Sequence, residues 1–186
     1  MAIKQRFTGE GRYITKRDIF TYICLVLLIF ISAVLQTTCL SLFGARCAIT
    51  LAIVCASGFI RGERAGALLG LFGGMLVDIL GSSGFSLSPV LYLLCGYLCG
   101  ALVGWFLSTN LPSFIVFAAI AGVLREIFTI IHYGLVSQDF NLWQIILYPV
   151  IPEYFAYLLC AIPAYGAVAG INKLFNKRNI RAKRNY

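Results

Sequence analysis

Long apolar runs alternate with short polar segments over the length of this chain. The polar segments carry charged residues, glycines or prolines, which are typical of connections between helices. About 20 helical residues cross a hydrocarbon core of about 30 Å, and the longer runs have this length. The apolar runs cover residues 19–42, 47–60, 65–80, 89–107, 113–136 and 144–170. This pattern predicts an all-α integral membrane protein with six transmembrane helices.

Two of the six runs depart from a simple spanning helix. Residues 47–60 would reach only about 21 Å at helical rise. We therefore expect Arg46 and Arg61 to extend toward the membrane surfaces, or flanking residues to lengthen the helix. The last run contains Pro149, Pro152 and Pro163. Because proline removes a backbone donor and clashes with the preceding turn, we expect a bend or break near residues 149–152.

The composition agrees with a membrane protein, since 60% of the 186 residues are hydrophobic and only 12% are charged. A net charge of +8 could suggest a nucleic-acid ligand. The positions of the charges exclude that class, because nearly all the basic residues lie in short polar segments between apolar runs. Their abundance therefore has to be explained by the membrane.

The basic residues are distributed unequally between the two predicted sides. Five lie in residues 1–17, two in residues 61–64 and six in residues 171–186, whereas the opposite side carries only Arg46. By the positive-inside rule, both termini are expected in the cytoplasm. We predict a basic cytoplasmic N-tail at 1–17, a six-helix membrane domain at 18–170 and a basic cytoplasmic C-tail at 171–186. Both tails suit anionic lipid headgroups.

Glycines recur at every fourth residue in two of the runs. Residues four apart lie on one face of a helix, so each series predicts a groove without side chains where another helix packs closely. The expected helix-packing or partner-interface residues are Gly62, Gly66, Gly70, Gly74, Gly96, Gly100 and Gly104. Asp78 continues the first series. A carboxylate inside an apolar helix is costly and marks a candidate functional position.

Three further charged residues are expected inside the membrane. Arg125 and Glu153 would lie at similar depths, about 14–17 Å from the outer ends of their helices, so we predict that they pair. Neighbouring helical residues point about 100° apart, which disfavours a pair between Arg125 and Glu126. One arginine cannot neutralise Asp78, Glu126 and Glu153 together. At least one carboxylate should therefore be protonated, hydrated or paired with another protein.

The sequence offers few groups for catalysis. Residues 81–84 read Gly-Ser-Ser-Gly, which matches the GxSG pattern of rhomboid intramembrane proteases, and His132 is the only histidine. Turn chemistry in a glycine-rich loop explains this short pattern without catalysis. The seven cysteines, an odd number, show no metal-ligand spacing and are interpreted as packing residues. We predict no catalytic, cofactor-binding or metal-binding residues.

Several of these segments resemble one protein family. Gly44-Ala-Arg46 precedes a short helix, the glycine-rich run 66–78 ends in Asp78, and Gly84-Phe is followed by Tyr92-Leu-Leu-Cys-Gly96-Tyr-Leu-Cys-Gly100. This arrangement resembles the rod shape-determining protein MreD family, most clearly over residues 40–105. The glycine-rich helix that ends in Asp is the most specific part of the match.

The resemblance implies a non-enzymatic scaffold in the bacterial cytoplasmic membrane. Such a protein would bind MreC and link MreB filaments to a peptidoglycan glycosyltransferase and transpeptidase. The alternative is a substrate-binding subunit of an energy-coupling-factor-type vitamin transporter, which has a similar size and helix number. That function needs a polar pocket near the outer face, which Asp78, His132, Asn141 and Trp143 could supply.

Overall fold

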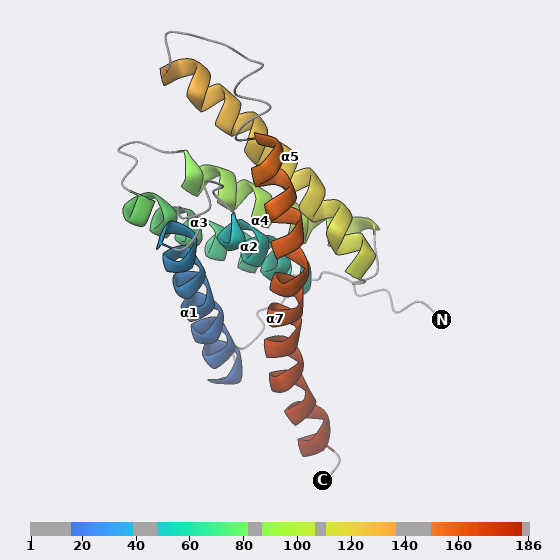
Figure 1. Cartoon of the computed structure of the whole chain (residues 1–186). Helices are drawn as coiled ribbons and strands as arrows, with labels where there is room; N and C mark the ends of the chain where they lie inside the picture. The colour runs from blue at the N-terminus through green and yellow to red at the C-terminus, as the bar shows by residue number, and fades with distance from the viewer. Residues whose placement is uncertain (1–15, 39–47, 82–86, 107–110, 137–149, 184–186) are drawn as a thin grey trace.

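The chain is helical throughout the part that its structure describes. The computed structural model describes residues 16–38, 48–81, 87–106, 111–136 and 150–183. Within these ranges there are six helices and no strands (Figure 1). They are α1 (Lys16–Thr38), α2 (Ile49–Arg61), α3 (Glu63–Gly81), α4 (Ser88–Phe106), α5 (Leu111–Val136) and α7 (Ile151–Lys183). The predicted all-α class is therefore confirmed for these residues.

Four of the helices are long and apolar enough to cross a membrane, namely α1, α3, α5 and α7. The apolar part of α4 is shorter, and α2 has 13 residues, or about 20 Å at helical rise. This combination is compatible with a multi-pass membrane protein.

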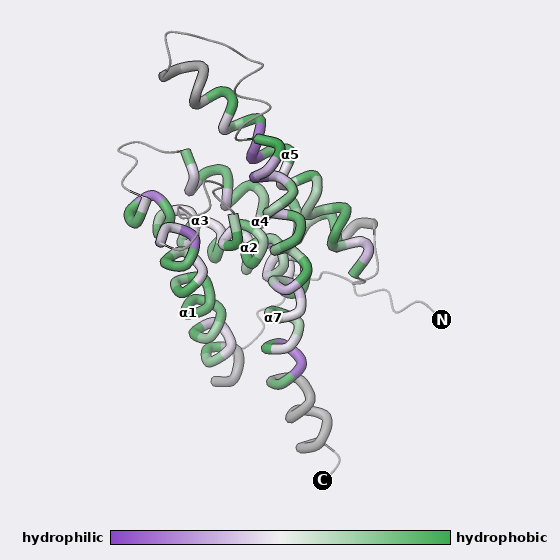
Figure 2. Tube along the Cα trace, viewed as in Figure 1, coloured by the Kyte–Doolittle hydropathy of each residue, from purple (hydrophilic) through white to green (hydrophobic). Residues whose placement is uncertain are grey.

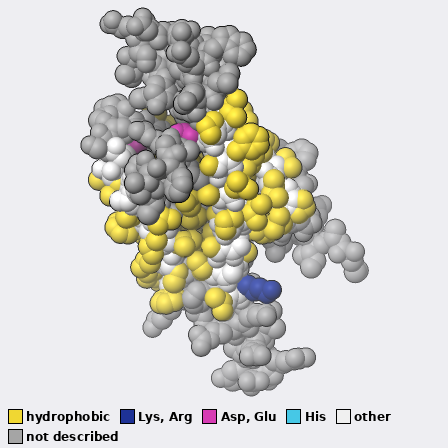
Figure 3. Space-filling model, in the orientation of Figure 1, with side chains coloured by type: hydrophobic (Ala, Val, Ile, Leu, Met, Phe, Trp, Pro, Cys, Tyr) yellow, Lys and Arg dark blue, Asp and Glu magenta, His cyan; other side chains and the backbone are white. Residues whose placement is uncertain are grey.

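The outer surface of the bundle is also compatible with lipid. Large apolar side chains are exposed along the outer helices, such as Leu27 and Phe30 on α1 and Phe155 and Leu159 on α7. Figure 2 shows apolar residues along most of α1, α5 and the described part of α7. In Figure 3, hydrophobic side chains cover most of the surface that described residues contribute. Exposed apolar surface on this scale marks contact with another apolar phase.

The shortest helix lies at the centre. α2 contacts each of the other five described helices, and every residue from Thr50 to Phe59 is buried. An apolar segment of about 10–14 residues is more typical of a buried core helix than of a membrane span. At its end, the guanidinium of Arg61 lies 4.7 Å from the ring centroid of Tyr22 in α1, a cation–π contact. Arg61 thus covers an aromatic ring of its own chain.

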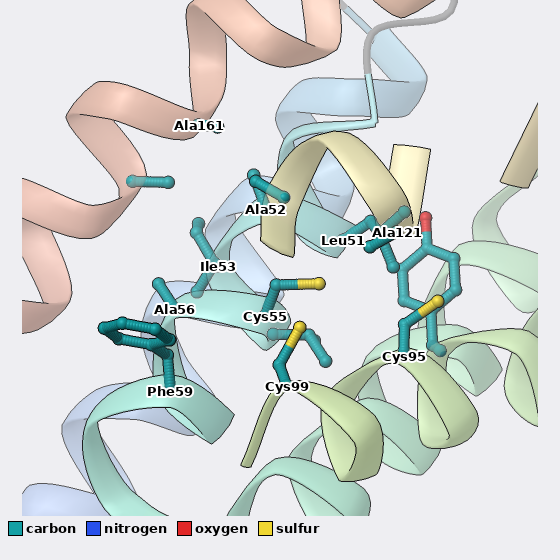
Figure 4. Close-up of a cluster of buried hydrophobic side chains, with 14 of the residues drawn as sticks. Leu51, Ala52, Ile53, Cys55, Ala56, Phe59, Cys95, Cys99, Ala121 and Ala161 are labelled. Carbon is teal, nitrogen blue, oxygen red and sulfur yellow. The ribbon is translucent and has the colours of Figure 1, made fainter. Parts of the chain in front are cut away.

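The core around α2 is made of small and aromatic side chains. Figure 4 shows Cys55 of α2 and Cys99 of α4 pointing their sulfur atoms toward each other, with Cys95 close by. The Phe59 ring meets Phe114 of α5 edge to face, with centroids 5.6 Å apart. The cysteines of the described segments are not joined in disulfides, and no group of three or more His, Cys, Asp or Glu side chains there could hold a metal ion.

The last helix is longer than the apolar run that predicts it. The described part of α7 begins at Ile151, continues through Pro163 and ends at Lys183, well past residue 170. The Lys- and Arg-rich sequence after 170 has good helix propensity, so the polar tail can extend the apolar helix. Residues 144–149, where the expected bend begins, lie outside the described residues.

Candidate functional site

The glycines of α3 and α4 lie against each other. The two helices are antiparallel neighbours, and a Cβ added to Gly66 would overlap the carbonyl oxygen of Gly96, while one added to Gly96 would overlap that of Gly66. One turn further along, a Cβ on Gly70 would overlap the carbonyl oxygen of Tyr92. A Cβ on Gly74 would lie 2.5 Å from Cα of Pro89. Only glycine permits this approach of two backbones.

At the other end of the same contact, α4 meets the turn between α2 and α3. A Cβ on Gly100 would overlap the backbone of Glu63 and lie 2.5 Å from the carbonyl carbon of Gly62. Gly62 itself is not part of the α3 face, because it ends α2 with φ of 99°, a left-handed conformation that favours glycine. Gly104 lies in α4, outside the residues whose side chains are described. The glycines that share the spacing of four therefore have two roles: Gly62 forms a turn, and the others that are described pack helices together.

Two further glycines, Gly58 and Gly122, are closely packed although the sequence did not predict it. A Cβ on Gly58 of α2 would overlap the carbonyl oxygen of Gly96 and lie 3.3 Å from Cα of Gly66, so three helices meet there. Gly58 precedes Gly62 by four residues, and extending the series backward would have found it. Gly122 of α5 lies under the ring of Tyr157, where an added Cβ would be 2.8 Å from Cε1 of that ring. No other glycine lies four residues from this position in the sequence.

The charged residues form a second feature, between α5 and α7. Nη1 of Arg125 lies 2.6 Å from Oε1 of Glu126, and Nη2 lies 3.1 Å from Oε2 of Glu153. The predicted contact between Arg125 and Glu153 is present. The expectation that Arg125 pairs poorly with its neighbour Glu126 is wrong. The guanidinium is long and forked, so it can return to its own helix with one nitrogen while it crosses to α7 with the other.

This triad is nearly closed to the outside. Glu126 is 5% exposed and Glu153 is 6% exposed, while the Arg125 side chain is 13% exposed. Oε2 of Glu126 is buried and has no hydrogen-bond partner in the described structure. A buried ionised oxygen without a partner is costly. The triad therefore has one position where its hydrogen bonding is incomplete.

Other polar groups continue from the triad across the bundle. Tyr92 of α4 is buried, and Arg125 of α5 and Gln36 of α1 lie near its side chain. Oε1 of Gln36 accepts a hydrogen bond of 3.2 Å from the backbone nitrogen of Thr50. The hydroxyls of Thr50 and Ser32 lie 3.3 Å apart. Polar groups from α1, α2, α4, α5 and α7 thus lie in one part of the bundle, and together they are called the polar cluster.

The cluster lies toward one end of the bundle. Its members occupy the C-terminal halves of α1 and α5 and the N-terminal halves of α2, α4 and α7. In Figure 1 the C-terminal end of α1, the C-terminal end of α5 and the start of α7 are each the upper end of their helix. In Figure 3 the visible acidic side chains lie toward that end and the visible basic side chain lies toward the other.

Asp78 is on α3 at this end, but the structure does not bring it into the triad. It is partly buried, and its Oδ1 has no hydrogen-bond partner among the described residues. Of the other residues proposed for an outer pocket, Asn141 and Trp143 lie outside the described residues, and the side chain of His132 is not described. Residues 82–84 of the Gly81–Gly84 segment also lie outside the described residues.

Comparison of the chain with protein-family models, with curated proteins and with solved structures found no match.

Proposed function

We propose that this protein is a non-enzymatic membrane scaffold of the bacterial cell-elongation machinery, similar to MreD. In this proposal it spans the cytoplasmic membrane six times, with both termini in the cytoplasm. It binds MreC and thereby connects MreB filaments with the enzymes that polymerise and cross-link peptidoglycan. The basic tails contact anionic lipid at the cytoplasmic surface.

The observation that carries the proposal is the role of the glycines within the resembling motif. Gly66, Gly70 and Gly74 pack directly against α4 near Gly96, Tyr92 and Pro89. The motif therefore specifies how three helices are held together, which is what a fold-determining family signature would do. A scaffold also needs an ordered set of helices more than it needs converging reactive groups.

The same contacts restrict where a partner could bind. The described motif glycines that pack closely do so against this chain, so a partner helix cannot use their grooves without displacing α4 or α3. In our proposal MreC therefore contacts the outer apolar surface of the bundle. This differs from the simplest interpretation of the glycine repeats, in which one groove serves both packing and partner binding.

A second candidate function is supported by the polar cluster. Gln36, Thr50, Tyr92 and the Arg125 triad gather from five helices at one end of the bundle. With the proposed topology this is the outer end, where a substrate-binding subunit of an energy-coupling-factor-type transporter would hold a vitamin. The cluster is largely closed by its own contacts, so we favour the scaffold.

The two functions are distinguished in the native host. Tagged protein would be purified in a mild detergent, and its partners identified by mass spectrometry, while depleted cells would be examined for shape and vitamin uptake. The scaffold proposal expects MreC among the partners and rounded cells on depletion. Transporter ATPases among the partners, with reduced vitamin uptake and unchanged cell shape, would establish the second function instead.

A further inference from the structure

The charges of the Arg125 triad do not balance if all three side chains are ionised. Within 3.1 Å of the guanidinium there are two carboxylates, Glu126 and Glu153, and both residues are at least nine-tenths buried. Arg125 is the cation that Glu126 contacts, and Glu153 shares the same guanidinium. An ionised triad would therefore carry an excess negative charge in an apolar bundle, where such a charge is strongly disfavoured.

One oxygen atom of the triad, Oε2 of Glu126, could bind a proton and so remove the excess negative charge. Arg125 and Glu153 make further interactions besides their mutual contact, whereas Oε2 of Glu126 has no hydrogen-bond partner among the described residues. Its other oxygen, Oε1, accepts the contact from Arg125. The two oxygens of Glu126 are therefore not equivalent.

We propose that Glu126 is a proton-binding site and carries a proton on Oε2 at neutral pH. The uncharged carboxyl group still accepts a hydrogen bond from Arg125 through Oε1. Arg125 and Glu153 then form a neutral ion pair between α5 and α7. An unpaired hydroxyl is also less costly to bury than an unpaired ionised oxygen.

A proton suits this site better than a metal cation. Hard cations need about six or more oxygen ligands, and no group of three or more suitable side chains is assembled in the described segments. A proton needs no cavity and no further ligand, which agrees with the burial of Glu126.

The test is infrared spectroscopy of the full chain in lipid nanodiscs at neutral pH. A protonated carboxylic acid gives a carbonyl band separate from that of a carboxylate. We expect this band in the wild-type protein and its shift when the glutamates carry ¹³C in their carboxyl groups. Glu126→Gln should remove the band, whereas Glu63→Gln, at the opposite end of α3 from Asp78, should retain it.

Several outcomes would overturn the proposal. One is the absence of a protonated band in the wild-type protein; another is a band that does not move with ¹³C-glutamate, which would place the proton on an aspartate. Glu126→Asp keeps the charges of the triad and serves where Glu126→Gln does not fold: its band should no longer shift with ¹³C-glutamate, whereas a band that still shifts would assign the proton to Glu153. A sodium-dependent rise in thermal stability, with no protonated band, would assign a metal cation.

Discussion

Gly66 of α3 and Gly96 of α4 each occupy the space that a side chain on the other would need. The relationship is reciprocal, because a Cβ on either residue would meet the carbonyl oxygen of the other. Gly58 of α2 approaches the same point, so one contact fixes the positions of three helices. The tolerance of these helices to substitution should therefore depend on position much more than on the residue type introduced.

Replacing Gly66 with Leu should disrupt the bundle. The side chain would clash with backbone atoms of both α2 and α4, which cannot move as a flexible side chain can. We expect a destabilisation at or above the upper end of the about 1–3 kcal/mol seen for overpacked cores. The measurement is the midpoint of unfolding in detergent. Gly166→Leu on α7 is the control, because a Cβ there meets nothing within 4 Å; equal losses in both variants would contradict this interpretation.

Removing the arginine of the triad should be more damaging than removing one of its partners. Arg125→Gln leaves two buried carboxyl groups without a cation, and we expect a loss of about 3–5 kcal/mol. In a double-mutant cycle, Glu153→Gln should restore part of that loss. Strictly additive effects would show that the 3.1 Å contact is energetically unimportant. Arg64→Gln, on an exposed residue, serves as the control.

Substitution of a buried and of an exposed aromatic residue should have very different effects on stability. Phe59 is 1% exposed and packs against Phe114 and Tyr165, so Phe59→Ala should cost about 3–5 kcal/mol through the cavity that it leaves. Phe155 is 62% exposed, and Phe155→Ala should have little effect on unfolding. Comparable losses from the two variants would mean that α7 has a further partner over Phe155.

The proposed topology can be tested with reporter fusions. A reporter that is active only outside the cytoplasm should be silent after Tyr186 and active when inserted near Ser83, because the basic residues are concentrated on one side. Activity at the C-terminal fusion would require an odd number of membrane crossings and would contradict six spans.

Glycine substitutions should also report on function. Gly70→Leu or Gly100→Leu would push α4 away from α3 or from the turn at Gly62, while leucine still favours insertion into the membrane. If the scaffold proposal holds, both variants should insert but lose MreC in co-purification, and the cells should become round. Asp78→Asn removes charge without adding bulk and therefore separates electrostatic from packing effects. Normal shape and intact MreC binding in both glycine variants would contradict the proposal.

The helical class and the close-packed glycines could be predicted from sequence because both depend on local patterns. Apolar length predicts a helix, and a spacing of four places Gly66, Gly70 and Gly74 on one face. What the repeat could not reveal was the partner of that face, because Gly96 and Gly58 become neighbours only after the chain has turned twice. Gly62 illustrates the same limit, since the spacing of four continues through a turn that interrupts the helix.

The Arg125 triad shows how side-chain reach limits such predictions. The depth of each residue along its helix correctly predicts that Arg125 pairs with Glu153. The angle between adjacent residues argued against Glu126, but that angle describes the direction of Cβ rather than the position of a guanidinium several bonds away. Tyr92 and Gln36 come together from different helices, α4 and α1, and no spacing in the sequence marks them as neighbours.

The central position of α2 has a consequence for how the protein enters the membrane during synthesis. A segment of 13 residues is too short to remain stably inserted by itself, and it is followed at once by α3, so the two should enter the membrane together as a hairpin. Part of the surface that shields α2 comes from α7, which begins about 90 residues later at Ile151. Until that helix is made, α2 is incompletely covered, so a nascent chain that stops before α7 would leave part of its core exposed.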